Sequence, residues 1–236
     1  MPEFDLIIDT SIFGAAVGLG TGDDSSRKLI FSDVTHEIQD SARRLPLIVE
    51  QAMNQAGIKA EDIGRIVISQ GPGSFTGIRV GLAYAYGFFK GLISKANPQA
   101  KIAGVSSLQV LATHFGGNLG QDVAVFLPST KTTGYAATFS NGNSSLLPLD
   151  LAKGVDAVLL DKVWLVLGAW NGLSEAAQSA GIQTFQNMDP RENARLALGV
   201  INDRLSADSG LAWSEVMPGA IYLRKSTVEE KAEAGK

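Results

Sequence analysis

The spacing of apolar residues changes in a set order along the first half of the chain. Short apolar runs at 6–8, 15–20 and 28–34 are typical of strands, and their short polar connections predict an antiparallel meander. From Ile38 onwards apolar residues recur every three or four positions, as on one face of a helix, and Pro46 should bend or split that helix. A strand at 65–68, a helix at about 77–95 and a strand at 101–105 follow. This order predicts an α/β fold.

The second half repeats this order more weakly. Strands are predicted at 123–127, 135–139 and 164–167, and a helix at 174–180. A last helix begins at Pro190, with Asp189 as its cap and Glu192 completing the capping box.

Two strand-rich halves of this kind predict a two-lobed actin-like (ribonuclease H-like, ASKHA) fold, in which helices flank mixed sheets. We expect a first lobe at 1–108 and a smaller, more divergent second lobe at 109–236, whose tail after Ser226 is frayed. No low-complexity linker separates the two halves, so we expect the lobes to pack together.

Composition restricts the possible functions. The 236 residues are 45% hydrophobic and 19% charged, with a formal net charge of −4, which suits a folded protein and argues against a stand-alone tRNA binder. The chain has no cysteine, which excludes disulfides and thiolate metal sites. Its only histidines, His36 and His114, lie far apart in sequence. No apolar run reaches the roughly 20 residues of a membrane helix, and the first residues lack a secretory pattern, so we expect a cytoplasmic protein without membrane contact.

The string Gln-Gly-Pro-Gly-Ser-Phe-Thr-Gly-Ile-Arg-Val-Gly at 70–81, here called the glycine motif, lies between a predicted strand and a predicted helix. Ser74 or Thr76 could cap that helix, and its free amides could hold an anion. A tight turn that needs glycine only for steric reasons is an equally open interpretation. A Walker-type phosphate loop is excluded because Ile78 follows Gly77 where a lysine is required, and the glycine spacing of a dinucleotide fingerprint is absent.

As a whole, the glycine motif resembles the signature of the TsaB family. Asp9-Thr10-Ser11, the Gly-Val-Ser-Ser-Leu at 104–108 and the Tyr-Leu-Arg at 222–224 resemble further family elements in order and place. The resemblance is strong over about the first half of the chain and patchy after it. One departure is that the family's Asp-Ala-Arg element is replaced by Pro-Ser-Thr-Lys at 128–131, which puts any role of that Asp and Arg in doubt here.

The resemblance implies a non-catalytic subunit of a tRNA threonylcarbamoyladenosine synthesis complex. Its partners would be a TsaD-type enzyme, which transfers the threonylcarbamoyl group to the adenosine beside the anticodon, and a TsaE-type ATPase. The chain would contact tRNA only indirectly. It would have no catalytic residue, metal or cofactor of its own, and ATP or ADP would bind only in the complex.

The helix that follows the glycine motif points to an interface. Glycines recur every four residues at Gly73, Gly77 and Gly81, and small residues allow another helix to approach closely. Tyr84 and Phe88 lie off the main apolar seam, so the helix is apolar on more than one side. The predicted interface, for a TsaD-type enzyme or for a homodimer through the same surface, consists of Ile38, Ala42, Leu45, Val49, Gly73, Phe75, Gly77, Gly81, Tyr84 and Phe88.

Two other functions stay open from the residues alone. The first is a nucleotide-dependent enzyme of the actin-like fold, such as a kinase or ATPase, which tight ATP binding by the isolated chain would reveal. Against it, Asp9 lacks the glycine expected two positions later, so a turn-capping role for this aspartate is favoured. The second is a self-associating scaffold unrelated to tRNA. A TsaD-like metal site is not predicted, because it needs two histidines on one helix.

Overall fold

The computed structural model describes residues 4–22, 27–35, 37, 40–168, 170–179, 181, 185–206 and 211–223. His36, Ile38 and the predicted frayed tail lie outside these residues. The first sheet has the order β3-β2-β1-β4-β5. Its strands are β1 (Phe4–Asp9), β2 (Ala16–Thr21), β3 (Lys28–Val34), β4 (Ile63–Ser69) and β5 (Lys101–Val105). β1, β2 and β3 form the predicted antiparallel meander, whereas β4 and β5 run parallel to β1.

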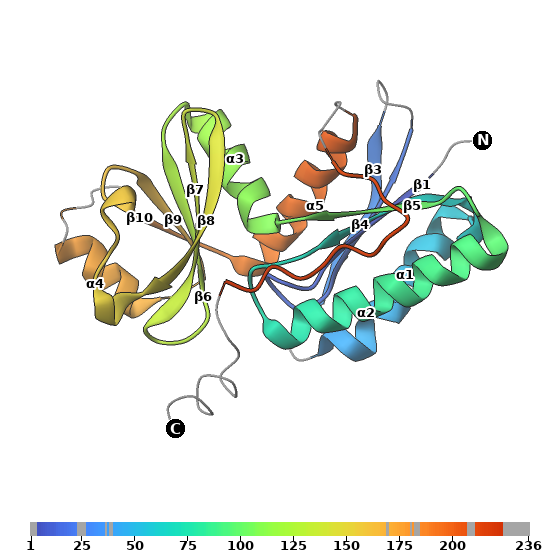
Figure 1. The fold of residues 1–236 in the computed structure, drawn as a ribbon, viewed down its shortest axis with the longest axis horizontal. Helices are drawn as coiled ribbons and strands as arrows, with labels where there is room; N and C mark the ends of the chain where they lie inside the picture. Colours follow the sequence, from blue (N-terminus) through green and yellow to red (C-terminus); the bar gives the residue numbers. More distant parts are fainter. Residues whose placement is uncertain are drawn as a thin grey trace.

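The second sheet repeats this topology strand for strand. Its order is β10-β9-β6-β7-β8, in which β7 is antiparallel to both β6 and β8, and β9 and β10 run parallel to β6. The strands are β6 (Val123–Pro128), β7 (Thr133–Ser140), β8 (Asn143–Asp150), β9 (Val163–Leu167) and β10 (Phe185–Met188). The molecule therefore has the predicted two-lobed actin-like fold of mixed sheets flanked by helices (Figure 1).

Four of the five α-helices in the described residues lie where the sequence pattern predicts a helix. The five helices are α1 (Ser41–Ala56), α2 (Phe75–Gly91), α3 (Ser107–Leu119), α4 (Asn171–Ser179) and α5 (Pro190–Ser206), and α2 continues into a π-helical stretch at Leu92–Ala96. Pro46 does not split α1. Asp189 caps α5 as predicted, because its Oδ1 accepts hydrogen bonds from the amides of Arg191 and Glu192 at 2.8 and 3.1 Å.

The sequence analysis missed α3, β8 and β10. The start of α3 carries a recognisable cap, since Ser106 Oγ accepts a hydrogen bond from the amide of Gln109 at 3.3 Å. The strand β8 lies at the edge of its sheet and mixes polar residues with Pro148, which obscures the alternation typical of strands.

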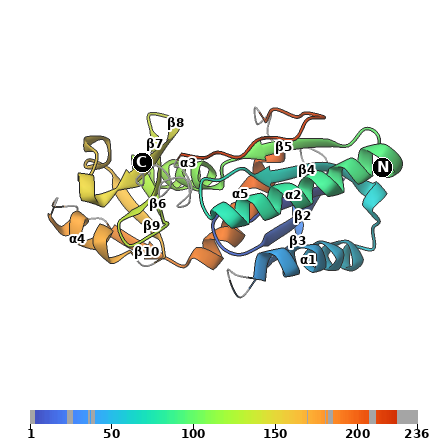
Figure 2. The same cartoon turned by 60° about the horizontal axis from the view of Figure 1, so that its bottom comes forward.

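The central strands are buried on both faces. In β1, Leu6 and Ile8 point to the side covered by α1 and α2, whereas Ile7 points to the side covered by α5 and α3. In β6 the same alternation sends Ala124 and Phe126 toward α4 and sends Val125 toward α3. Figure 2 shows these layers, with α1 and α2 lying side by side on the outer face of the first sheet. Continuous apolar strands of this kind require helices on both faces of the sheet.

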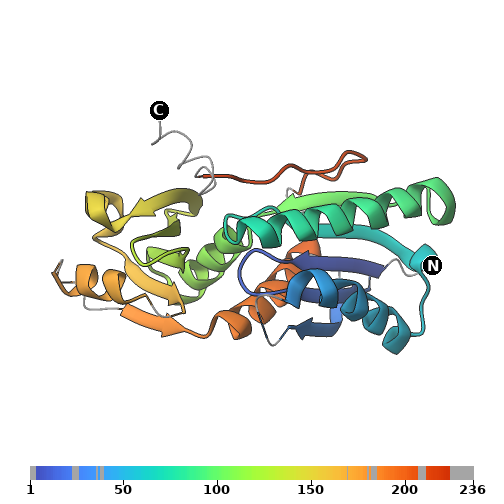
Figure 3. The ribbon, with the colours of Figure 1, turned by 90° about the horizontal axis from the view of Figure 1, so that it is seen from below.

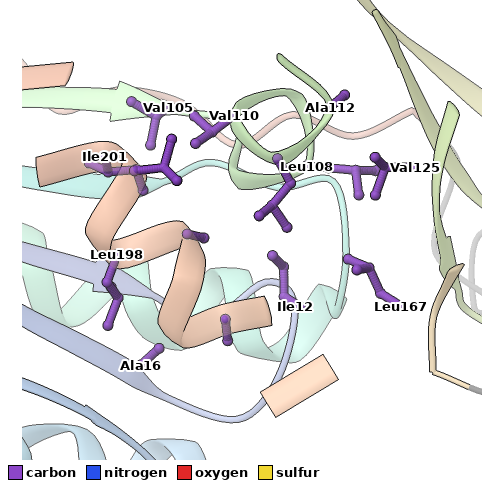
Figure 4. Packing of buried hydrophobic residues seen from close by; sticks show 14 of the residues in the cluster. Ile12, Ala16, Val105, Leu108, Val110, Ala112, Val125, Leu167, Leu198 and Ile201 are labelled. Atoms are coloured by element: carbon purple, nitrogen blue, oxygen red, sulfur yellow. The ribbon is translucent and has the colours of Figure 1, made fainter. Parts of the chain in front are cut away.

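One apolar cluster joins the two lobes. α3 and α5 pack against each other between the sheets, and the cluster includes residues of both sheets (Figure 4). Ile12 and Ala16 belong to it from the first lobe, and Val125 and Leu167 from the second. α5 follows the second sheet in sequence, yet it packs on β1, β2 and β3. A lobe boundary after Leu108 stays a prediction, because the later part of the chain returns to the first sheet.

The segment at 211–223, here called the C-terminal strap, also returns to the first lobe. Figure 3 shows it running along the edge of the first sheet near α2. It joins the edge strand β5 through two backbone hydrogen bonds between Ile102 and Ser214, each of 3.0 Å. Within the part of the chain described, no helix has both the length and the apolar character needed to cross a membrane.

The shared cluster leads to a stability prediction. Leu198 of α5 is fully buried, whereas Leu119 at the end of α3 is 48% exposed. We expect Leu198→Ala to lower the free energy of unfolding by about 2–5 kcal/mol, because it leaves a cavity between the sheets, and Leu119→Ala to change it by less than about 0.5 kcal/mol. Urea unfolding followed by circular dichroism measures both values. Two separate transitions, only one of which responds to Leu198→Ala, would contradict a core shared by the lobes.

Candidate functional site

The loop after β1 and the end of β4 meet at one edge of the first sheet, because the two strands are parallel neighbours. Asp9 Oδ1 accepts hydrogen bonds from the backbone amide of Ser11 at 2.6 Å and from its hydroxyl at 2.7 Å. The hydroxyls of Ser11 and Ser69 lie 2.8 Å apart. Asp9 is almost fully buried. These bonds give Asp9 the turn-capping role that the sequence favoured.

The glycine motif is tied to this loop through its backbone. The amide of Ser74 donates to the carbonyl oxygen of Ser11 at 3.0 Å. Ser74 Oγ in turn accepts from the amide of Gly77 at 3.1 Å, so Ser74 is the N-cap of α2. The amide of Ile78 donates to the carbonyl of Ser74 at 2.8 Å. The amides of Ser74 and Gly77, at the helix start where an anion could have been held, are therefore engaged within the chain.

The three regularly spaced glycines face inward. A Cβ atom at Gly73 would overlap the carbonyl oxygen of Ser11, one at Gly77 would overlap that of Thr10, and one at Gly81 would overlap the Thr10 hydroxyl. The close approach that these glycines allow is therefore made by the chain's own loop after β1. The prediction that they accommodate the helix of a partner is wrong, because this loop already occupies the space.

The C-terminal strap holds the glycine motif from the other side. Gln70 accepts a hydrogen bond from the amide of Ile221 at 2.8 Å, and its side-chain amide donates to the carbonyl oxygen of Gly219 at 2.5 Å. The ring of Tyr222 packs against that of Phe75 with centroids 5.2 Å apart. The first turn of α2 is thus fixed by the loop on one side and by the strap on the other.

The predicted interface residues of α1 separate into two groups. Leu45 and Val49 have no exposed surface and pack in the core of the first lobe. Their side chains are therefore not available to a partner, which corrects their place in the predicted interface. Ala42 is exposed, as is the larger Leu47 of the same helix at 49%.

Tyr84 and Phe88 are half-buried and pack against the core of the first lobe, with their rings stacked at 6.1 Å between centroids. Burial raises the pKa of Tyr84 to about 12, and the negative charge of Glu50 on α1 adds to this shift. Both side chains thus help to seat α2 on the lobe, and they are less suitable as interface probes than the sequence suggested.

The outer face of α2 consists of Arg79, Ala83, Tyr86, Gly87 and Lys90, all of which are exposed. Tyr86 has 46% of its surface exposed, and Lys90 Nζ lies 5.4 Å from the centroid of its ring. A Cβ at Gly87 would meet no atom within 4 Å. The sequence analysis did not single out this face, although the spacing of four, three and four residues from Arg79 to Lys90 places these side chains on one side of a helix.

The second lobe forms its β6–β7 turn without the Asp and Arg that the family resemblance led us to look for. The amides of Ser129 and Thr130 both donate to the carbonyl oxygen of Thr133 at 2.9 Å. The indole of Trp170 donates to the carbonyl oxygen of Lys131 at 2.8 Å. Local hydroxyl and backbone bonds therefore determine the shape of this turn.

Of the two histidines, His36 lies outside the described residues. His114 lies in α3, half-buried, with its Nε2 3.0 Å from the side-chain nitrogen of Asn118. No group of three or more His, Asp or Glu side chains with the geometry of a metal site occurs among the residues described.

The two kinds of glycine on α2 lead to opposite predictions. Gly77→Ala should destabilise the protein by about 1–3 kcal/mol, because the new methyl group meets the backbone at Thr10. Gly87→Ala should stabilise it by about 0.5–1 kcal/mol, because the site is open and alanine favours the helix. Thermal unfolding of the two variants compares them directly. An equal effect of both substitutions would show that the loop does not constrain α2.

Tyr84 leads to a pH prediction. Its pKa in the folded protein, about 12, lies above the ordinary value of 10.0, so the folded state retains the phenol proton longer than the unfolded state. This contribution to stability is complete below pH 10 and is lost as the pH rises toward 12. Tyr84→Phe should therefore flatten the loss of stability across this range, as measured by urea unfolding at several pH values. Identical profiles for both proteins would contradict the assigned burial.

Comparison with known proteins identifies the family of this chain. A protein-family model described as "TsaD: tRNA N6-adenosine threonylcarbamoyltransferase" matches residues 35–178. The tRNA threonylcarbamoyladenosine biosynthesis protein TsaB of Bacillus subtilis (strain 168) is 30% identical over 115 residues, which cover 48% of this chain and 46% of that protein. TsaB of Buchnera aphidicola subsp. Schizaphis graminum is 32% identical over 113 residues, 48% of each chain. The matched region thus spans about half the length of these curated relatives.

A solved structure from Pseudomonas aeruginosa, described as an uncharacterized protein with similarity to peptidase YeaZ, has the same fold. It superposes with a TM-score of 0.65 at 20% identity and covers 94% of this chain and 100% of its own. The family match extends over more than half of the present chain, from the start of the α1 region through α4. On these grounds the chain belongs to the TsaB/YeaZ family, within the broader tRNA N6-adenosine threonylcarbamoyltransferase family.

Proposed function

We propose that this chain is a non-catalytic subunit that binds a TsaD-type enzyme and supports the transfer of a threonylcarbamoyl group to the adenosine beside the anticodon of tRNA. A TsaE-type ATPase would complete the complex. The curated relatives bear the name of tRNA threonylcarbamoyladenosine biosynthesis. The observation that carries the proposal is the outer face of α2, which presents an exposed aromatic ring and open glycines on a helix whose other side is seated on the lobe.

The glycine motif supports a structural role for the chain rather than a catalytic one. The amide of Ser74 is bonded to the loop after β1 and the amide of Gly77 to the Ser74 hydroxyl, while the inward-facing glycines lie against the loop. Asp9 is buried with its Oδ1 engaged by Ser11. This arrangement favours binding over nucleotide chemistry, so we place ATP or ADP only in the assembled complex. The tRNA would be contacted mainly by the partners, and the complex would act in the cytoplasm.

A second copy of the chain is an alternative occupant of the same surface. An isologous dimer through α1 and α2 would compete with the heterodimer for the same residues. Titration of the chain with the TsaD-type enzyme distinguishes the two assemblies. If both use the same surface, the added enzyme dissociates the homodimer as the heterodimer forms.

Tyr86→Glu tests the proposed interface. The substituted side chain remains in water in the free chain, so we expect thermal unfolding to change little. Burying an unpaired carboxylate against a partner should weaken binding of the host's own TsaD-type enzyme by about tenfold or more. Isothermal titration calorimetry measures the affinity. The matched control is Leu160→Glu on the second lobe, where 43% of the leucine is exposed.

Phe88→Glu serves as a contrast. It should destabilise the fold, because Phe88 packs against the core of the first lobe.

Wild-type affinity of the Tyr86→Glu variant for the TsaD-type enzyme would remove the outer face of α2 from the interface.

A further inference from the structure

The charges on α2 are all of one sign. Arg79 and Lys90 are its only ionisable acidic or basic side chains apart from the tyrosines, and Lys95 follows in the π-helical stretch. The neighbouring helix α1 carries Arg43, Arg44 and Glu50, and its cap residue Asp40 pairs with Arg43 at 3.0 Å, so the excess positive charge of this surface comes from α2. The chain as a whole has a formal net charge of −4, so this surface opposes the overall charge of the protein.

Aromatic rings hold both cations of the outer face in place. The guanidinium of Arg79 lies 3.8 Å from the ring centroid of Phe75, which itself packs against Tyr222 of the C-terminal strap. Lys90 lies over Tyr86 at 5.4 Å. Neither cation forms a salt bridge with any residue that the structure describes. Such a cation is positioned but not neutralised, and it loses less side-chain freedom when a carboxylate binds.

The two cations lie on one line along the helix. Eleven residues separate them, which is about three turns, so they face the same direction at a separation of about 16 Å along the axis. Ala83 and Gly87 lie between them, and a Cβ at Gly87 or Gly91 would meet no atom within 4 Å. A second helix can therefore lie close along α2 and reach both cations.

We propose that the outer face of α2 binds an acidic amphipathic helix of a different protein, and that Arg79 and Lys90 select this partner over a second copy of the chain. The inference rests on the proposed function and specifies the chemistry of the partner surface. The partner helix carries carboxylates about eleven residues apart, or three turns, on its contacting face. Charge complementarity decides the occupant, because an antiparallel copy of α2 would place Arg79 against another cation, Lys90.

Charge reversal tests the proposal. Arg79→Glu combined with Lys90→Glu should weaken binding of the host's TsaD-type enzyme by about tenfold or more. It should also reverse the salt dependence of the association rate, because the new glutamates repel the partner's carboxylates and salt screens this repulsion. The control combines Lys131→Glu and Lys153→Glu, which change the net charge equally on exposed side chains of the second lobe. We expect the control to bind like the wild type. Unchanged affinity of the α2 variant would overturn the proposal.

Homodimer measurements test the alternative occupant. Wild-type chain is mixed with the Arg79→Glu, Lys90→Glu variant and examined by analytical ultracentrifugation. Preferential formation of mixed dimers would show that α2 faces a second copy, which would overturn the proposal. The proposal expects no such preference. Thermal unfolding of the neutral variant Arg79→Gln, Lys90→Gln separates folding from binding, and this variant should show an intermediate loss of affinity.

A peptide probe distinguishes this inference from the proposed function. The probe is a stapled amphipathic helix with two glutamates eleven residues apart, compared with its lysine counterpart. If the wild-type chain binds no TsaD-type enzyme, the proposed function fails, whereas a preference for the glutamate peptide would still support the charge selection. If the enzyme binds but charge reversal has no effect, only the further inference fails. Equal binding of both peptides would also overturn it.

Discussion

Contact between the loop after β1 and the glycines of α2 determines how that helix lies on the first sheet. Carbonyl oxygens of Thr10 and Ser11 occupy the positions that Cβ atoms would take at Gly77 and Gly73. The helix therefore lies against the backbone of the loop, and Ser74 ties its first turn to Ser11. Because this side is fixed, the opposite side, with Tyr86 and the two cations, must face outward. The same glycines that suggested a partner interface thus turn a different surface of α2 outward, and this outer face is the one that we propose as the interface.

The two lobes do not have separate cores. α3 and α5 lie between the sheets, and residues of both sheets join one cluster around them. Since close-packed interiors transmit strain rather than absorb it, the relative position of the lobes is coupled to the packing of these two helices. Within the first lobe, the C-terminal strap connects β5 to the glycine motif. The end of the described chain therefore contributes to the position of the first turn of α2.

The charge of α2 is opposite in sign to the net charge of the chain. A protein with excess negative charge presents a helix without carboxylates, and aromatic rings hold its cations on one line. Exposed charges of this kind contribute little to the stability of the free chain, so their main effect is on which partner approaches and how quickly. The half-buried pair of Tyr84 and Phe88 has the opposite role, since it seats the helix on the lobe.

The sequence by itself determined the order of elements from β1 to β5, the repeated halves and the family, because apolar periodicity and the glycine motif are local signals. It also predicted the cap at Asp189, whose bonds involve only the next few residues. Only the tertiary structure decided which side of α2 is buried, because Gly77 and Tyr86 both occur in an apolar helix. Gly77 faces inward because it lies against Thr10, which is far away in the chain, and Tyr86 is therefore left exposed. It likewise placed Leu45 and Val49 in the core and α5 on the first sheet. Long-range packing decides such questions, and no spacing along one helix records which neighbour will cover it.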